Sequence, residues 1–514
     1  MPDIVLSTLN ARWTHASLGL RYLQANLRDL AGRSRLREFE IGRPPVEIAA
    51  EILRERPRIV GFGVYIWNVR ETTEVVGILK RVSPDIRIVI GGPEVSYEAD
   101  DMEIVRLADH VVRGEADHAF RSLCEDLLAA DVAARPSPPK AIDAVLPTFA
   151  DLALPYDLYD DVDVSRRTLY VEASRGCPYE CEFCLSALDI PVRQAPLEAF
   201  LAAMTRLYDR GARRFKFVDR TFNLNLRFAE SILRFFLDRK SPELFLHFEM
   251  VPDRFPAELR SLVASFLPGA LQFEVGVQTL DDGTAARIAR RQDTAKLADN
   301  LMFLRDAGVH VHADLIVGLP GEDLSTFAAG FDRLYAMGPD EIQVGVLKRL
   351  RGAPVKRHDA VMSYAPHPPY EILRSDVLDF ESLLKLKRFA KAWDWIANSG
   401  NFTETLRLSL AEGGAFARFS AMAEHVFAAA GPQAAFQGVA LSRLVEIVFE
   451  HLVRERKFDP ATLAPVLLAD YQRGGRSDLP PCLRPHLPAT TLATRTDRAT
   501  PARRPGLERQ DRRT

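Results

Sequence analysis

The chain has 514 residues, 27% charged side chains and a net charge of −3 at pH 7, which is typical of a globular protein with about three domains. The slightly negative net charge does not indicate nucleic-acid binding. The chain has no run of about 18 uncharged apolar residues, so we expect no membrane span, and its first residues lack the basic segment of a signal peptide. Five cysteines are too few for a disulfide framework, so we expect a cytoplasmic protein.

Residues 1–132 alternate between apolar strand patterns and amphipathic helix patterns, and we expect them to form one domain. Strands are predicted at 3–9, 35–41, 59–64, 86–90 and 110–113, and helices at 18–30, 46–55 and 69–82. This alternation predicts a doubly wound, flavodoxin-like α/β domain, whose ligand would bind at the carboxyl ends of the strands.

The turns after these strands carry glycine and aromatic residues in place of a nucleotide-binding motif. Neither a Gly-x-Gly-x-x-Gly turn after the first strand nor a Walker A sequence occurs. Glycine lets a backbone approach a flat ligand closely, and aromatic rings offer it apolar surface. Ordinary packing is the alternative for the aromatic residues. The candidate ligand-binding residues are Trp13, Tyr65, Trp67, Gly91, Gly92, Gly114 and Glu115.

Residues 133–165 open with a proline-rich stretch and are predicted to be a stiff linker. Three of the five cysteines follow within eight residues, at Cys177, Cys181 and Cys184, in a loop after a predicted strand at 168–174. A structural zinc site needs four ligands, usually in two pairs, and no second pair is present. The triplet therefore favours a 4Fe–4S cluster with one open iron, with zinc and unligated thiols as alternatives.

The Cys-x3-Cys-x2-Cys spacing, with Phe183 just before the last cysteine, resembles the signature of the radical S-adenosylmethionine (SAM) superfamily. Residues 275–279 and 314–322 also resemble its fourth-strand and fifth-strand motifs. The resemblance implies a partial (β/α)6 barrel over 166–353, a cluster that binds SAM, and a one-electron reductant such as flavodoxin or ferredoxin. The remaining barrel strands are predicted at 214–218, 244–250, 271–277, 309–317 and 341–347.

The resemblance also implies cofactor contacts at the carboxyl ends of the barrel strands. Phe183 would lie beside the SAM adenine. Asp219 would take the place of the Gly-Gly-Glu turn that usually holds the SAM amino group in the family, because this chain has Val218-Asp219-Arg220 there. Arg290 or Arg291 would pair with the SAM carboxylate, and the residues leave this choice open.

Three further barrel residues are candidates for contacts to ribose or substrate: Glu249, Glu274 and Gln278. The alternative for Glu249, Glu274 and the nearby Asp314 is a salt-bridge network that lines the barrel.

An α/β domain with Gly-Gly-Pro and Arg-Gly-Glu turns, placed directly before such a barrel, is similar to the cobalamin-binding domain of cobalamin-dependent radical SAM enzymes. Domains that place a histidine on cobalt carry Asp-x-His-x-x-Gly. Here Trp13 replaces the aspartate and Gly19 follows His15 by four residues, so we expect no cobalt ligation by His15.

The two resemblances together imply an enzyme that cleaves SAM and uses cobalamin to methylate an unactivated carbon of an unknown substrate. Three alternatives stay open: radical chemistry without methyl transfer, a non-catalytic cobalamin-sensing or metal-sensing protein, and an N-terminal domain that has lost its ligand.

Residues 354–480 have a helical composition, with helices predicted near 373–384, 404–411, 415–429 and 440–456. This region matches no chemical motif, and the resemblance implies an extension that covers the barrel mouth. Tyr364, His367 and Tyr370 lie in a proline-rich segment, for which we expect a surface loop, with a position at the barrel mouth as the alternative. Residues 481–514 are rich in proline, threonine and arginine and are predicted to form a disordered tail.

Overall fold

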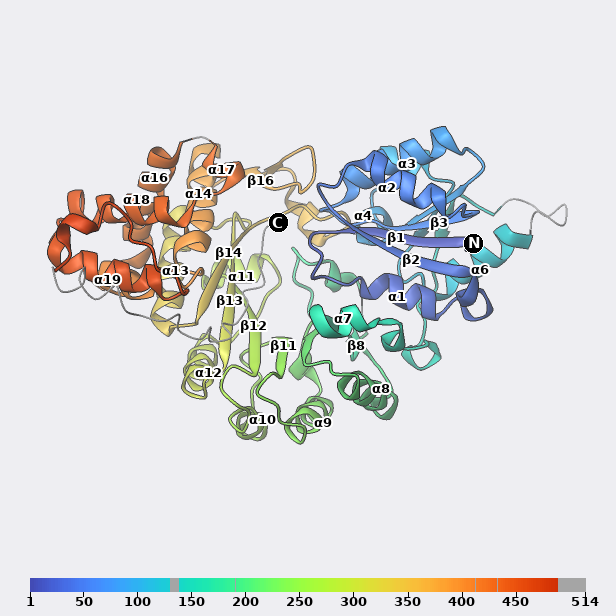
Figure 1. Ribbon diagram of the computed structural model, residues 1–514, viewed down its shortest axis with the longest axis horizontal. Helices are drawn as coiled ribbons and strands as arrows, with labels where there is room; N and C mark the ends of the chain where they lie inside the picture. The colour runs from blue at the N-terminus through green and yellow to red at the C-terminus, as the bar shows by residue number, and fades with distance from the viewer. Residues whose placement is uncertain (130–137, 190, 412, 432, 489–514) are drawn as a thin grey trace.

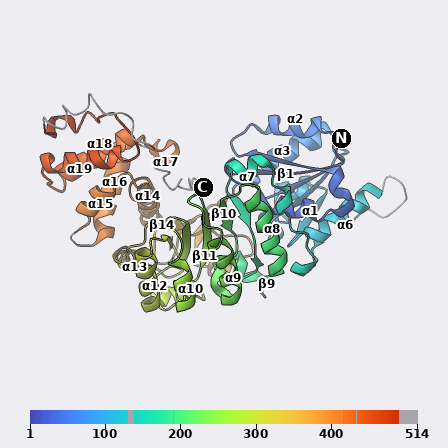
Figure 2. The ribbon, with the colours of Figure 1, turned by 60° about the horizontal axis from the view of Figure 1, so that its bottom comes forward.

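The computed structural model describes residues 1–129, 138–189, 191–411, 413–431 and 433–488. An N-terminal α/β domain, a central barrel and a helical C-terminal domain follow one another along an arc (Figure 1). The barrel helices lie on the outer side of this arc, as a second view also shows (Figure 2). Among the described residues, no helix has both the length and the apolar surface that a membrane crossing requires.

The N-terminal domain is built on a six-stranded sheet in the order β2-β1-β3-β4-β5-β6, in which every pair is parallel. Helices α2 and α3 cover one face and α1 and α6 the other, each over its own apolar cluster, which confirms the doubly wound prediction. The elements are β1 (Ile4–Asn10), α1 (Leu18–Ala25), β2 (Ser34–Glu40), α2 (Pro45–Arg54), β3 (Ile59–Gly63), α3 (Val69–Val82), β4 (Arg87–Gly91), α4 (Pro93–Ser96), α5 (Glu103–Leu107), β5 (His110–Arg113), α6 (Asp117–Ala129) and β6 (Ala141–Asp143).

The segment predicted as a linker, 133–165, is in large part folded. Residues 133–137 lie outside the described residues, but β6 extends the sheet at the open edge of β5, and α7 spans Asp161–Arg166. Tyr156 and Tyr159 are fully buried against the barrel core. These apolar side chains give the segment enough packing surface to order it, which the proline content alone does not indicate.

The central domain contains six parallel strands in the order β14-β13-β12-β11-β10-β7, as expected for a partial barrel. The first strand ends earlier than predicted, at Val171. The chain then forms a hairpin of two short antiparallel strands, β8 (Ser174–Arg175) and β9 (Arg193–Gln194), which the cysteine loop connects. The main elements are β7 (Leu169–Val171), α8 (Leu197–Asp209), β10 (Arg214–Phe217), α9 (Leu226–Leu237), β11 (Phe245–Met250), α10 (Ala257–Val263), β12 (Leu271–Gln278), α11 (Asp282–Arg287), α12 (Thr294–Asp306), β13 (His310–Val317), α13 (Leu324–Met337) and β14 (Glu341–Val346).

The C-terminal domain is helical, with α14 packed between the barrel and α16. The helix predicted at 373–384 starts later, since Ile372–Arg374 form strand β16 against β15 (Ser363–Tyr364) and Asp379 caps the new helix by accepting a hydrogen bond from Ser382 N. Apolar spacing alone did not separate this strand from the helix that follows. The helices are α14 (Phe380–Ile396), α15 (Thr403–Ser409), α16 (Ala415–Ala430), α17 (Ala434–Gln437), α18 (Leu441–Arg454) and α19 (Pro460–Gln472).

The predicted disordered tail is ordered at its beginning. A short 3-10 helix, η7 (Arg484–His486), lies between Leu483 and Leu487, which are 0% and 8% exposed and belong to the main core. Two apolar side chains thus anchor this stretch despite its proline and arginine content. Residues 489–514, where the rest of that prediction falls, lie outside the described residues.

We predict that Leu483→Ala lowers the free energy of unfolding by about 2–5 kcal/mol, because it removes a fully buried side chain and leaves a cavity. Val377→Ala, at a side chain that is 42% exposed, is the control and should stay within about 0.5 kcal/mol of the unmodified chain. Urea unfolding measures both. Equal losses in the two variants would contradict the packed tail.

Candidate functional site

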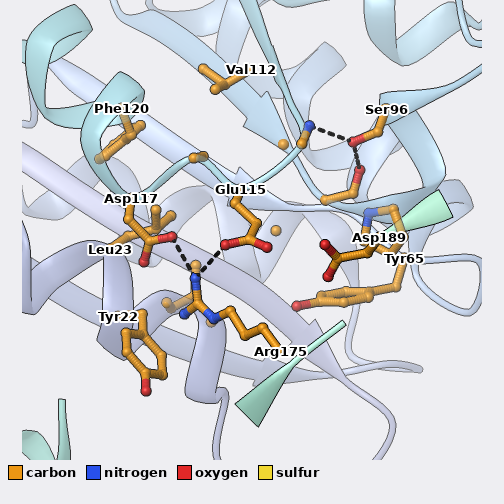
Figure 3. Close-up of a pocket in the computed structure, with 18 of the residues that line it drawn as sticks. Tyr22, Leu23, Tyr65, Ser96, Val112, Glu115, Asp117, Phe120, Arg175 and Asp189 are labelled. Atoms are coloured by element: carbon orange, nitrogen blue, oxygen red, sulfur yellow. Dashed lines mark hydrogen bonds and ion pairs between the residues drawn. The ribbon is translucent and has the colours of Figure 1, made fainter. Parts of the chain in front are cut away.

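Two cavities lie where the carboxyl ends of the two sheets meet. The first, which we call the glycine cavity, has a volume of about 480 Å³ and is lined by both the N-terminal domain and the barrel (Figure 3). The second, the thiol cavity, has a volume of about 160 Å³ and lies in the mouth of the barrel. Ser186 and Arg220 line both, so the two cavities share a border.

The glycine cavity takes its floor from the ends of three neighbouring strands. Gly63, Gly91 and Gly114 line it, so no side chain covers this part of the sheet edge. Gly92 has φ +112°, and a Cβ there would lie 2.5 Å from Val64 O, which restricts this turn to glycine. Ser96 Oγ donates to Gly92 O at 2.8 Å and accepts from Gly114 N at 3.2 Å, which ties the two turns together.

The three aromatic candidates do not share one wall. Tyr65 lines the glycine cavity, and Trp67 stacks on it with a ring separation of 4.4 Å while lining a neighbouring cavity of about 370 Å³. Trp13 lines neither of these cavities; its ring lies under the Arg167 guanidinium at 4.7 Å. A cation–π contact to the barrel therefore occupies Trp13. His15 borders the neighbouring cavity beside Tyr170, not the glycine cavity.

The thiol cavity contains most of the residues singled out on the barrel strands. Among the described residues, no three His, Cys, Asp or Glu side chains lie close enough to share a single metal ion. The thiols nevertheless face one space, and the Arg290 guanidinium donates to Cys181 Sγ at 3.6 Å. Burial raises the pKa of the Cys177 thiol. The predicted residues that line the cavity are Cys177, Cys181, Phe183, Cys184, Glu249, Glu274, Gln278 and Arg290.

Glu249 and Glu274 line the cavity and also belong to a charge network. His247 Nε2 lies 3.0 Å from Glu274 Oε2, and Lys216 Nζ lies 3.6 Å from the same oxygen. Burial raises the pKa of Glu249 to about 7; the Arg220 guanidinium opposes this shift and the Glu274 carboxylate adds to it. Glu249 is thus a carboxyl group that can exchange a proton near neutral pH.

Asp219 and the two arginine candidates for SAM contacts lie in different surroundings. Asp219 is buried and lines neither cavity, because its carboxylate accepts hydrogen bonds from Ala173 N at 3.0 Å and Ser174 Oγ at 2.6 Å. It therefore holds the chain just before the cysteine loop. Of the two arginine candidates, Arg290 lines the thiol cavity and Arg291 is exposed.

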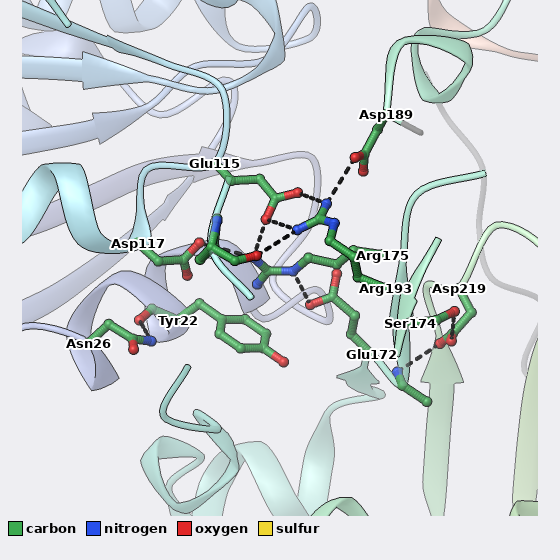
Figure 4. Close-up of polar contacts among 12 residues, drawn as sticks. Tyr22, Asn26, Glu115, Asp117, Glu172, Ser174, Arg175, Asp189, Arg193 and Asp219 are labelled. Carbon is green, nitrogen blue, oxygen red and sulfur yellow. Dashed lines mark hydrogen bonds and ion pairs between the residues drawn. The ribbon is translucent and has the colours of Figure 1, made fainter. Parts of the chain in front are cut away.

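Arg175, which the sequence did not single out, joins the two domains at the edge of the glycine cavity (Figure 4). Its guanidinium donates to Glu115 at 2.8 Å and Asp117 at 3.0 Å in the N-terminal domain, and to Glu172 at 3.0 Å in the barrel. The Tyr22 ring lies 4.5 Å away. Arg175 stands two residues before Cys177, so this contact also places the cysteine loop.

A second arginine reinforces the same contact. Arg193 donates to Glu115 and, at 2.9 Å, to Asp189, and both arginines belong to the β8–β9 hairpin. Burial opposes the charge of Glu115, but Arg193 and Arg175 hold its pKa below the usual value. Glu115 was predicted as a ligand residue. The structure places it in the cavity wall as an anchor for the hairpin, with its carboxylate engaged by protein.

The chain after β14 contacts segments next to both sites, and we define residues 348–374 as the bridge. Tyr370, predicted on a surface loop, is 8% exposed and donates to Glu94 at 2.8 Å, directly after the Gly-Gly-Pro turn. Earlier in the bridge, His358 Nε2 and Arg357 lie 2.8 Å and 3.0 Å from the buried carboxylate of Glu182, inside the cysteine loop. The bridge therefore contacts the surroundings of both cavities.

We predict that Arg175→Ala lowers the free energy of unfolding by about 3–5 kcal/mol, because it leaves three nearby carboxylates without this cation in a buried place. The control is Arg206→Ala, which removes an exposed pair with Asp157 and should cost at most about 1 kcal/mol. The first transition in urea unfolding reports the loss. A difference of less than about 1 kcal/mol between the variants would contradict the role of Arg175.

We predict opposite pH effects at two adjacent carboxyls after β13. Burial raises the pKa of Glu322 from 4.5 to about 7, so its ionisation destabilises the fold as the pH rises through this interval. Glu322→Gln should therefore gain up to about 3 kcal/mol at pH 8 and nothing near pH 4. Hydrogen bonds from Thr326 and Ser325 lower the pKa of Asp323 to about 2. Asp323→Asn should therefore lower the free energy of unfolding at pH 8, and this loss should become smaller as the pH falls toward 2.

Unfolding free energies at pH 5 and pH 8 distinguish the two variants. A stability gain for Glu322→Gln that does not change with pH would show that its carboxyl does not titrate in this interval.

Three family models match the chain in sequence order. The B12 binding domain covers residues 5–124, the radical SAM superfamily covers 171–334, and a protein family of unknown function, DUF4080, covers 358–489. The first match contains the floor of the glycine cavity, and the second contains all residues that line the thiol cavity. The bridge begins after the second match, and its residues 358–374 lie within the third.

Curated relatives match in part. The uncharacterized methyltransferase PH0819 of Pyrococcus horikoshii is 29% identical over 208 residues, 36% of this chain and 44% of that protein. The cobalamin-dependent radical SAM methyltransferase TokK of Streptomyces tokunonensis is 31% identical over 160 residues, 27% of this chain and 23% of that protein. The matched parts thus span less than half the length of either relative.

Solved structures share the fold over more of the chain. The cobalamin-dependent S-adenosylmethionine radical enzyme OxsB, solved with aqua-cobalamin, aligns with a TM-score of 0.62 and 13% identity over 92% of this chain and 79% of that one. The methyltransferase TsrM from Kitasatospora setae, solved with cobalamin and a [4Fe-4S] cluster, aligns with a TM-score of 0.56 and 19% identity over 71% of this chain and 76% of that one. Residues 171–334 thus match the radical SAM superfamily, and residues 5–124, which precede them, match the B12 binding domain.

Proposed function

We propose that the protein is a cobalamin-dependent radical SAM methyltransferase that acts on an unactivated carbon of a substrate bound between its two cavities. The observation that carries this proposal is the shared border: Ser186 and Arg220 line both the glycine cavity and the thiol cavity. A substrate at this border would be within reach of a ligand in either cavity. The named activities of TokK and TsrM support the same reaction class.

The thiol cavity is assigned to a 4Fe–4S cluster and SAM. Three thiols from one loop face one space, and soft sulfur ligands of this kind suit iron–sulfur clusters. Gln278 Oε1 is buried with no hydrogen-bond partner among the described residues, so a donor from a bound molecule would satisfy it. Cys177, Cys181 and Cys184 would hold the cluster, and Phe183, Gln278 and Arg290 would contact SAM.

The glycine cavity is assigned to cobalamin. Its volume of about 480 Å³ lies in the range of small-molecule sites, and its glycine floor accepts a flat ring close to the backbone. Tyr65, backed by Trp67, supplies apolar surface. His15 lies outside the lining of this cavity, which supports a site without histidine on cobalt.

The reaction needs two kinds of chemistry that protein side chains lack: a bound cluster would supply the electron for reductive cleavage of SAM, and bound cobalamin would carry the methyl group. The chain's own residues bind, orient and exclude water. Glu249, with its pKa near 7, would accept or release a proton at its carboxylate in the barrel mouth. A flavodoxin or ferredoxin remains our proposal for the one-electron reductant.

Metal analysis of anaerobically purified protein, grown with cobalamin, tests the assignment. We predict about four iron with sulfide and about one cobalt per chain. Cys181→Ala should lose the iron and keep the cobalt, whereas Cys482→Ala, at a cysteine outside both cavities, should keep both. Iron without cobalt would remove the cobalamin assignment, and stoichiometric zinc without iron would remove the cluster.

The reaction products test the methyl transfer itself. A methyltransferase of this kind forms S-adenosylhomocysteine together with 5′-deoxyadenosine when substrate is present. Formation of 5′-deoxyadenosine alone, in the presence of substrate and cobalamin, would leave a radical SAM enzyme that does not transfer methyl groups.

A further inference from the structure

Arg220 occupies the border between the two cavities. It follows β10 in the turn that begins at Val218, and it lines both the glycine cavity and the thiol cavity. The side chain of Arg220 is 55% exposed, and it borders these open spaces. The only other described residue with this double position is Ser186, a neutral side chain.

The hydrogen-bond donors of Arg220 are not engaged by protein. Among the described residues its guanidinium has no hydrogen-bond partner, and its ion-pair contact, Glu249, lies 3.9 Å away, beyond hydrogen-bond distance. The neighbouring arginines differ. Arg175 donates to three carboxylates, and Arg290 donates to Cys181 Sγ, Gly276 O and Gln292. Arg220 is therefore a cation whose hydrogen-bond donors are available to a ligand in the glycine cavity or the thiol cavity.

A free guanidinium at such a place recognises a particular chemistry. Its planar set of donors matches the paired oxygens of a carboxylate or a phosphate, which it binds through two parallel hydrogen bonds. We propose that Arg220 is an anion receptor and that the substrate presents a carboxylate or phosphate group to it. This inference rests on the proposed function and narrows it to an anionic substrate held between the two cofactors.

SAM also carries a carboxylate, and it is the other source of this chemistry. Arg290 lies beside the thiols, where the methionine part of SAM would bind, and does not line the glycine cavity. Arg220 also interacts electrostatically with Cys184 and Cys177, but unlike Arg290 it lines the glycine cavity as well, on the side where the substrate would meet both cofactors. The position of Arg220 thus favours an anionic group of the substrate over the SAM carboxylate as its ligand, and separate measurements distinguish the two.

The first measurement uses inorganic phosphate as the probe. Anaerobic holoenzyme with cob(II)alamin and saturating S-adenosylhomocysteine is titrated with phosphate, and the ³¹P relaxation rate reports phosphate near the paramagnetic cobalt. We expect a saturable effect in the unmodified enzyme and about tenfold or more weaker binding in Arg220→Gln. Arg220→Lys, which keeps the charge and loses the paired geometry, should fall between them. A cobalt relaxation effect that is absent, or that Arg220→Gln leaves unchanged, would overturn the proposal.

Arg291→Gln is the matched control, since Arg291 is exposed and lines neither cavity. It should bind phosphate as the unmodified enzyme does. An equal loss in Arg291→Gln would mean that the effect comes from general surface charge, which also overturns the proposal.

The second measurement addresses the SAM carboxylate. Dissociation constants for S-adenosylhomocysteine and for its decarboxylated analogue are compared between the unmodified enzyme and Arg220→Gln. We expect changes of less than about threefold for both ligands. A loss of about tenfold or more confined to S-adenosylhomocysteine would assign Arg220 to the SAM carboxylate and overturn the substrate assignment.

Iron and cobalt are counted in every sample. Equal counts in Arg220→Gln and the unmodified enzyme show that the variant is folded and loaded, so that the phosphate result then judges Arg220 alone. If the chain binds neither iron nor cobalt, this result contradicts the proposed function and, with it, the inference about Arg220.

Discussion

The arrangement of both cavities depends on the buried charge cluster around Arg175. One guanidinium satisfies carboxylates from the N-terminal domain, Glu115 and Asp117, and from the barrel, Glu172. Because an uncompensated charge in this interior is costly, the domains are held in the one relative position that pairs them all. The same hairpin leads into the cysteine loop, so a single electrostatic constraint sets the glycine cavity, the thiol cavity and their common border.

Burial of acidic groups is the second feature that unites the structure. Desolvation raises the pKa values of Glu172 and Glu249 to about 7 and of Asp219 to about 6. Two of the three have structural partners: Arg175 for Glu172, and Ser174 with a backbone amide for Asp219. Glu249 differs, since the Arg220 guanidinium stands 3.9 Å away and both side chains face open space. The border thus differs from the anchoring clusters around it, because the carboxyl group of Glu249 and the guanidinium of Arg220 face space that a ligand can occupy.

The sequence predicted the layers of the fold and missed how some segments pack. Strand and helix periods located both sheets, because each element carries its own apolar face. Proline content predicts a linker at 133–165 and a disordered tail from residue 481. A few apolar side chains in these segments, Tyr156, Tyr159 and Leu483 among them, are nevertheless buried in the core. The helix start at Phe380 was missed since one apolar spacing served a strand and then a helix.

By itself, the sequence determined the cysteine loop, the glycine turns and the order of the domains, because these depend on local spacing and on residue types that allow few backbone conformations. Only the tertiary structure decided which polar side chains remain for ligands. Asp219 and Trp13 are engaged by protein, at Ser174 and under Arg167, whereas no group among the described residues accepts a hydrogen bond from the Arg220 guanidinium. Hydrogen-bond and charge pairing joins residues far apart in the chain, so no local pattern reveals which donors and acceptors are already satisfied.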